Sequence, residues 1–226
     1  MDHNECSDVF KDIRDLSFRF KSASDDEKIL SILKNVLKNE LKNELKDGRP
    51  ILLSEKNNYR NGILHFLTKS VCINSFLYIL NNFPDAILHI NNKNLFGDTP
   101  LILATQYGDF NMIENILLFG KDKILINERN SDGNTALHVA AAQIRPTRIL
   151  ELLLQNGADP YLKNNFDNSP KDFVINMAEL YESDEIDGED DITQPELETE
   201  LEAMGKKDIV ISNRDLLVNY QDLPPY

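Results

Sequence analysis

The chain has 226 residues, of which 41% are hydrophobic and 27% charged, and its formal net charge is −14. This acidity disfavours nucleic acid and anionic membrane as partners, because both repel a negative surface. No apolar run reaches the roughly 18 residues of a membrane-spanning helix, and residues 1–5 do not begin a secretory signal. The two cysteines, Cys6 and Cys72, form no metal-ligand or disulfide pattern, so we expect no cofactor and a cytoplasmic location.

Residues 1–50 are predicted to be helical. An amphipathic pattern covers residues 8–20, and a second helix begins at the capping box from Ser24 to Glu27 and ends near Asp47. We predict that this pair caps the domain that follows it. The alternative is a separate pair of recognition helices for a partner.

The strongest signal is an internal repeat. Two segments pair a turn motif with an apolar helical pattern, and a third segment repeats the turn motif alone. The spacing is 36 residues from Thr99 to Thr135 and 34 residues from Thr135 to Ser169. The aligned segments are 94–104 with 112–120, 130–140 with 149–159, and 164–174.

Each copy predicts a turn followed by two helices. In the pattern Asn-x-x-Gly-x-Thr, Gly97 and Gly133 supply the positive φ of a tight turn. Thr99 and Thr135 are the expected N-caps of the first helix. A single unit cannot bury its apolar face, so the units are expected to stack. The glycines expected to end the second helices in a left-handed conformation are Gly120 and Gly157.

The motif resembles that of a known family. The segment 133–141, Gly-Asn-Thr-Ala-Leu-His-Val-Ala-Ala, is similar to the ankyrin signature G-x-T-P-L-H-x-A-A. The segment 152–159 is similar to the ankyrin ending L-L-x-x-G-A-D, whereas Ile102 departs from the usual histidine. The resemblance implies an all-α ankyrin-repeat solenoid of about four units over residues 51–182.

The first and last units are degenerate. In the first, His65 aligns with His138, and residues 73–80 would form the second helix. The resemblance implies that both histidines bond to loop backbone and support the turns. In the last, Lys171 and Asp172 stand where leucine and histidine are expected, and polar residues there fit a terminal unit with a solvated outer face.

Residues 183–226 are predicted to be an acidic tail. Ten acidic residues and no lysine or arginine lie between Ser183 and Gly205. Such a run is typical of a solvated charged surface rather than of an acid–base pair. The final residues 223–226, Leu-Pro-Pro-Tyr, resemble the L-P-x-Y motif read by WW domains.

The resemblance implies binding of a partner protein through turn tips and inner helices. Phe96 and Tyr107 are the strongest candidates, because exposed aromatic residues often anchor interfaces. The alternative for Phe96 is packing against the neighbouring turn. The expected tip positions are Leu95, Phe96, Asp98, Ser131, Asp132, Asn134, Asn165 and Asn168, and the expected inner-helix positions are Gln106, Tyr107, Ala142 and Gln143.

No catalytic fingerprint is present, so we expect a monomeric, non-enzymatic interaction module. Asparagine-rich, divergent ankyrin chains resemble effectors that intracellular bacteria such as Legionella deliver into the host cytosol. In that hypothesis, residues 196–202 resemble a secretion signal. A second hypothesis is an inhibitor that masks a basic partner surface with its acidic tail. A third is an enzyme with Cys6 as nucleophile.

Overall fold

The computed structural model describes residues 23–40, 53, 56–143 and 147–173. The chain divides into two compact units, Met1–Ser131 and Asp132–Tyr226. Within the described ranges all regular elements are helical. In unit 1 they are α2 (Ala23–Glu40), α4 (Ile63–Lys69), α5 (Ile73–Asn82), the 3-10 helix η1 (Pro84–His89), α6 (Pro100–Gln106) and α7 (Phe110–Gly120). In unit 2 they are α8 (Ala136–Ala141) and α9 (Thr147–Gln155).

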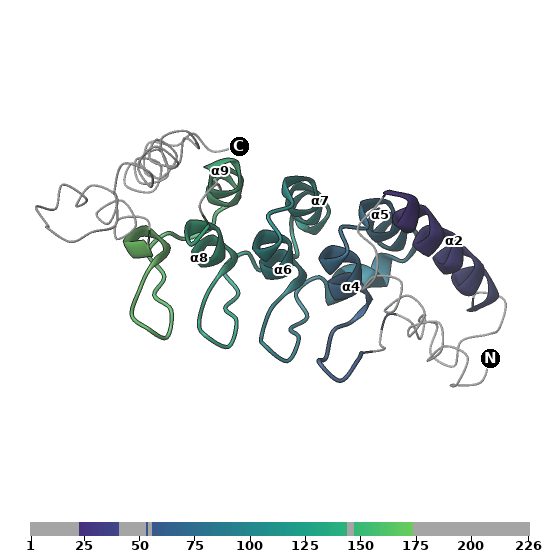
Figure 1. Ribbon diagram of the computed structural model, residues 1–226, viewed down its shortest axis with the longest axis horizontal. Coiled ribbons are helices and arrows are strands. Elements are labelled where there is room, and N and C mark those ends of the chain that lie inside the picture. The colour runs from purple at the N-terminus through teal and green to yellow at the C-terminus, as the bar shows by residue number, and fades with distance from the viewer. Residues whose placement is uncertain (1–22, 41–52, 54–55, 144–146, 174–226) are drawn as a thin grey trace, which may run out of the picture. The chain divides into compact units, whose positions relative to one another are not determined.

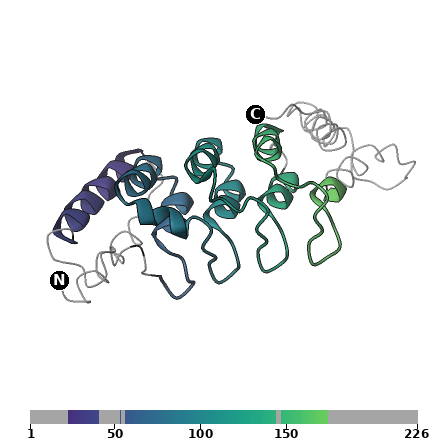
Figure 2. The ribbon, with the colours of Figure 1, turned by 180° about the vertical axis from the view of Figure 1, so that it is seen from behind.

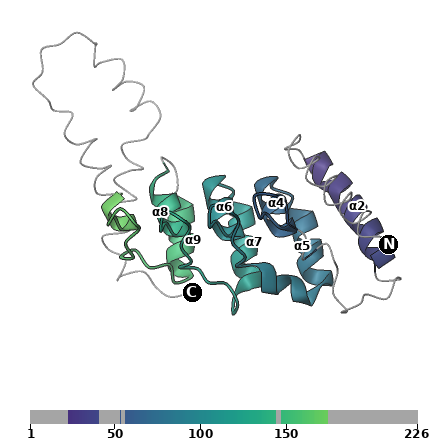
Figure 3. The same cartoon turned by 90° about the horizontal axis from the view of Figure 1, so that it is seen from below.

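Unit 1 contains two stacked helix pairs. Helix α4 packs against α5 and α6, and α7 packs against α6 and α5. The short helices α4 and α6 form one layer and α5 and α7 a second, as Figure 1 and Figure 3 show. The core of these helix pairs is mainly aliphatic, and it includes Leu64, Leu67, Phe76, Ile79, Leu101, Ile113 and Ile116. Burial of these side chains is what favours stacking of the pairs.

The predicted helix starts are confirmed. Thr99 and Thr135 have extended backbones, and their hydroxyls accept hydrogen bonds from the amides of Ile102 and His138. Each hydroxyl thereby satisfies an amide that has no partner within the helix.

Helix α7 ends at Gly120 as predicted, but the left-handed conformation expected of this glycine is wrong. Gly157 has the expected positive φ of 89°, but Gly120 is the last residue of α7 and does not have positive φ. Its carbonyl accepts hydrogen bonds from the amides of Lys123 and Ile124 at 2.7 and 2.6 Å, so the chain continues into a further turn. A Cβ at Gly120 would lie 3.1 Å from Ile124 Cβ. The glycine is therefore explained by close packing rather than by a left-handed stop.

A 3-10 helix extends the first repeat. The second helix predicted over 73–80 is observed as α5, and η1 follows it and packs against it. Ala86 and Ile90 are fully buried there. The segment after α5 is thus an ordered part of the core of unit 1.

Helix α2 covers the outer side of α5, as Figure 2 shows from behind. Ile29 and Leu33 of α2 have no solvent exposure. The predicted helix that begins at the Ser24 capping box is observed over Ala23–Glu40, and its predicted end near Asp47 lies outside the described residues. The predicted helix over 8–20 lies outside the described residues.

A buried carboxylate joins α2 to α5. The N-cap residue of α5, Cys72, makes no side-chain cap bond. Asp26 of α2 takes over this role: Oδ2 accepts the Asn74 amide at 2.8 Å, and Oδ1 accepts the Ser75 amide at 3.0 Å and the Ser75 hydroxyl at 2.6 Å. Asp26 is 5% exposed. A carboxylate is favourable here because the start of a helix carries partial positive charge.

In unit 2, α8 packs against α9, and a short helical segment follows Ser169. The carboxylate of Asp172 accepts hydrogen bonds from the Ser169 amide and hydroxyl at 2.8 and 2.7 Å. These bonds hold the pKa of Asp172 below its ordinary value. Asp172 therefore occupies the position that His138 has in the preceding repeat. Across the described part of both units, no helix is both long and apolar enough to span a membrane.

Replacing Asp26 is expected to weaken the attachment of α2. Asp26→Ala leaves the part-buried amide of Asn74 and the buried amide of Ser75 without their acceptor, so we expect about 2 kcal/mol less free energy of unfolding. Urea unfolding of the full chain measures this. Ser31→Ala, at an exposed position further along the same helix, is the matched control. Equal stability of the two variants would contradict the capping role of Asp26.

Candidate functional site

Four turns of common sequence, residues 57–61, 94–98, 130–134 and 164–168, carry most of the candidate site residues. The fourth residue of every turn has positive φ, although only two of the four are glycine. Asparagine and aspartate tolerate this conformation better than most residues, and arginine does so less readily. The four residues are Arg60 (58°), Gly97 (77°), Gly133 (79°) and Asp167 (63°).

An asparagine side chain organises each of three turns. Asn94 Oδ1 accepts the amides of Phe96 and Asp98, both at 2.9 Å. Asn57 and Asn164 make the equivalent pairs of bonds in their own turns. Because the asparagine satisfies these amides locally, the turn holds its shape without help from a ligand.

Neighbouring turns are also joined by backbone hydrogen bonds. In unit 1 the Leu95 amide donates to the Tyr59 carbonyl at 2.7 Å, and the Ser131 amide donates to the Phe96 carbonyl at 2.9 Å. A Cβ on Gly97 would lie 2.6 Å from the Ser131 nitrogen. Glycine is therefore required at this position by close approach as well as by φ.

The two predicted structural histidines bond as the sequence implies. His65 Nδ1 accepts the Gly62 amide at 3.2 Å, and Nε2 lies 3.2 Å from the carbonyl oxygen of Asp98 in the next turn. In unit 2, His138 Nδ1 accepts the Thr135 amide, and Nε2 lies 3.0 Å from the Asn168 carbonyl. Each imidazole thus links the start of its own helix to the following turn.

Burial keeps His65 neutral. Desolvation of the ring lowers its pKa from 6.5 to about 4, against the opposing effect of the bond to the Asp98 carbonyl. A neutral ring can accept at Nδ1 while it donates at Nε2, whereas a protonated ring cannot accept. The observed pair of bonds therefore depends on deprotonation.

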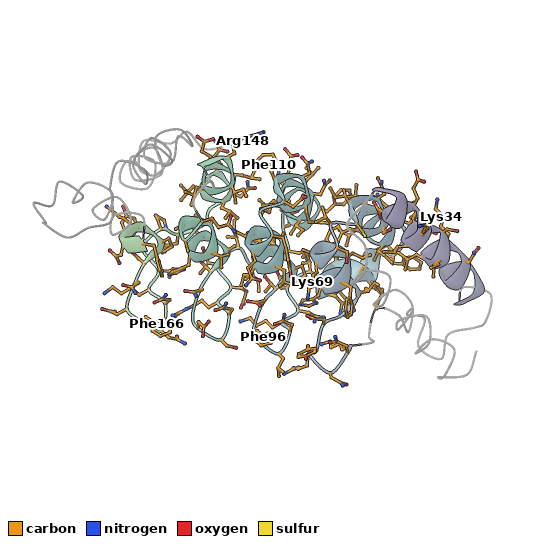
Figure 4. The ribbon with its side chains drawn as sticks, viewed as in Figure 1. Lys34, Lys69, Phe96, Phe110, Arg148 and Phe166 are labelled. Carbon is orange, nitrogen blue, oxygen red and sulfur yellow. The ribbon has the colours of Figure 1, made fainter. Side chains whose placement is uncertain are left out.

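Large apolar side chains lie at the third position of three turns. Tyr59, Phe96 and Phe166 are 55%, 57% and 68% exposed. Tyr59 and Phe96 stack with ring centroids 6.2 Å apart and an interplanar angle of 18°. Figure 4 shows Phe96 and Phe166 at the ends of their turns. Phe96 packs against the neighbouring turn and is also exposed. The expected packing and the expected exposure of this residue are therefore both observed.

Most of the predicted site residues are accessible. The exposed ones are Leu95, Phe96, Gln106, Tyr107, Ser131, Asp132, Ala142 and Asn165, and the half-buried ones are Asn134, Gln143 and Asn168.

Asp98 differs from this expectation because it is 5% exposed. Its carboxylate accepts a hydrogen bond from Asn130 Nδ2 at 3.0 Å. Its backbone carbonyl oxygen lies 3.2 Å from His65 Nε2. Asn134 is similarly engaged, since its Oδ1 accepts a bond from Asn164 Nδ2 at 2.7 Å. The fifth residue of these turns therefore links one turn to the next instead of facing outward.

The exposed positions of unit 1 fall into two groups. Leu95 and Phe96 lie in the turn before α6, whereas Gln106 and Tyr107 lie at the opposite end of that helix. Seven helical residues span about 10 Å, so one side chain of a partner cannot contact both groups.

Tyr59 and Phe166 are exposed turn residues that were not among the site positions expected from the sequence. The first turn lacks the glycine and threonine of the motif, and the last follows Asn-x-aromatic with aspartate at position four. Aligning the third turn positions would have revealed the recurring aromatic.

The described residues contain no group of three histidine, cysteine, aspartate or glutamate side chains that could hold a metal. Unit 1 does have an open groove of about 600 Å³, lined by Lys93 and residues 124–129. Lys93 forms an ion pair with Glu128 at its side.

Residues 64–164 match the family model for ankyrin repeats in three copies. The chain is 32% identical over 102 residues to ankyrin repeat-containing protein YGL242C of Saccharomyces cerevisiae, covering 42% of this chain and 56% of that protein. It is 32% identical over 105 residues to ANK repeat-containing protein nipk-1 of Caenorhabditis elegans, covering 42% and 16%. It is 32% identical over 116 residues to zinc finger CCCH domain-containing protein 56 of Arabidopsis thaliana, covering 50% and 14%.

The matches thus span 14% to 56% of the length of these relatives. They cover the repeats of this chain and support an all-α ankyrin-repeat fold, as the sequence predicts.

The pKa of His65 predicts that stability depends on pH. The folded pKa lies below the unfolded value of 6.5, so this contribution is complete above pH 6.5 and is lost as the pH falls toward 4. The expected loss is about 3 kcal/mol of unfolding free energy. NMR titration of the ring tests the cause, since a midpoint near 6.5 in the folded chain would contradict it. Unfolding of His65→Asn, which does not titrate at this position, is the control.

Proposed function

We propose that this chain binds a partner protein through the exposed side chains of its turns and of its inner-helix ends. Ankyrin repeats generally mediate protein–protein interaction and are typically not enzymes. The observation that carries the proposal is the stack of Tyr59 on Phe96. These two aromatic side chains come from neighbouring hydrogen-bonded turns, and each is more than half exposed.

The local geometry suits recognition. The asparagine and histidine bonds fix the turn backbone around Phe96 before any partner arrives. Binding then orders few additional groups, which lowers its entropic cost. Aromatic side chains held in this way commonly supply a large share of binding energy.

The proposal predicts that Phe96 and Tyr107 contribute to partner capture. A tagged full chain, Phe96→Ala and Tyr107→Ala are compared by affinity capture from a eukaryotic lysate with mass spectrometry. We expect each substitution to weaken recovery of a partner by about tenfold, as loss of an interface anchor does. A drop for only one variant identifies which of the two groups contacts that partner.

Leu118→Ala is the matched control, because Leu118 is an exposed large apolar residue on α7, away from the turns. Circular dichroism of each variant checks that its helices are retained. Equal recovery with the wild type and both aromatic variants would remove the turns and inner-helix ends as the binding surface.

A second candidate function rests on the ten acids between residues 183 and 205. In this proposal the chain is an inhibitor whose acidic segment masks a basic partner surface. Replacing those ten residues by the matching amides in the full chain should abolish partner binding. The dependence of binding on salt should disappear with it. Unchanged binding would eliminate this candidate.

The effector hypothesis concerns delivery rather than binding. If residues 196–202 act as a secretion signal, the same amide variant should lose translocation into host cells while the repeats keep their stability. Retained translocation would contradict that role. The cytoplasmic location and the host protein partner belong to the same proposal.

A further inference from the structure

The turn edge of unit 1 has a charge opposite to that of the whole chain. We define this edge as residues 56–61, 93–98 and 127–131. Its two acids are engaged: Asp98 is buried and bonded to Asn130, and Glu128 pairs with Lys93. The basic residues of the edge are all exposed, and they are Lys56, Arg60, Lys93 and Arg129. A chain of net charge −14 therefore presents a locally basic edge.

Apolar side chains lie among these cations. Leu95 is 54% exposed beside the Tyr59–Phe96 stack, and Leu125 is 55% exposed. The groove of unit 1 has both basic and apolar walls, because Lys93 and Arg129 line it together with Ile124, Leu125 and Ile126. The edge thus offers aromatic and aliphatic contacts within a row of positive charges.

We propose that the turn edge of unit 1 binds an acidic peptide segment that carries interspersed apolar residues. This inference rests on the proposed function and names the chemistry of its partner. A carboxylate of the segment pairs with Arg60 at the rim, where complementary charge favours association and selects partners. Its apolar side chains cover Leu95, the aromatic stack and the groove.

The same features fit single-stranded nucleic acid less well. Base binding uses free aromatic faces, whereas Tyr59 and Phe96 already stack on one another. Leu95, Ile124 and Leu125 are aliphatic, and Lys93 is paired with Glu128. The net charge of −14 also opposes approach of a polyanion at long range.

The turns in the described part of unit 2 carry one cation, Lys163, and so provide an internal comparison. Asp132 and Asp167 lie in its turns, and Lys163 is paired with Asp167 at 2.9 Å. Phe166 is exposed there, and its turn, residues 164–168, contains no lysine or arginine. Acidic ligands are therefore expected to use the unit 1 edge and to be indifferent to Phe166.

The test measures binding of fluorescent probe peptides to the full chain by anisotropy. One peptide alternates glutamate and aspartate with leucine and phenylalanine. The others have lysine in place of every acid, or serine in place of every apolar residue, and an oligothymidylate probes nucleic acid. We expect binding of the first peptide alone, weakening as salt is raised.

Variants locate the site. Arg60→Asp places at this turn position the residue that Asp167 provides in the last turn, so the backbone is tolerant of it. We expect it to raise the dissociation constant of the acidic peptide about fivefold or more, and Phe96→Ala to do the same. Lys34→Glu on α2 makes the same change in net charge away from the turns, as Figure 4 shows, and should leave binding unchanged. Phe166→Ala should also leave it unchanged.

Failure of the acidic peptide to bind, or equal binding to Arg60→Asp, overturns the inference. So does tight binding of oligothymidylate that Arg60→Asp weakens. If a cellular partner is still lost with Phe96→Ala while the acidic peptide does not bind, only the partner chemistry is wrong and the proposed function stands. If neither the peptide nor a partner depends on Phe96 or Tyr107, both proposals fail.

Discussion

The neutral imidazole of His65 is the interaction on which the geometry of unit 1 most depends. One ring nitrogen accepts the Gly62 amide at the start of α4, and the other bonds to the Asp98 carbonyl in the next turn. Helix start and turn are thereby tied together in a buried site, where an unpaired polar group would be costly. His138 repeats the arrangement in unit 2 with Thr135 and Asn168.

This linkage separates structural from accessible positions within each turn. The first and fifth residues are used internally, as Asn94 and Asp98 show. The second and third residues face outward, as Leu95 and Phe96 do. Variation at the outward positions changes the surface without disturbing the hydrogen bonds beneath it. The charge and apolar character of a partner can therefore differ between units that have the same backbone.

The degenerate parts of the chain use the same physical solutions with other residues. Arg60 and Asp167 adopt the positive φ that glycine adopts elsewhere, and Asp172 accepts the N-cap amide as histidine does. Where α5 has no capping side chain of its own, Asp26 supplies a carboxylate from α2. Contacts from other parts of the fold thus compensate for departures from the local motif.

The sequence by itself determined the repeat, the helix starts at Thr99 and Thr135 and the role of the histidines, because capping, turn conformation and apolar spacing are local properties. Only the tertiary structure decided the capping of α5 by Asp26, the burial of Asp98 and the stacking of Tyr59 on Phe96. These contacts join residues 32 to 49 positions apart in the sequence. Long-range contacts depend on how the repeats stack, and the residue spacing within one repeat does not specify this stacking.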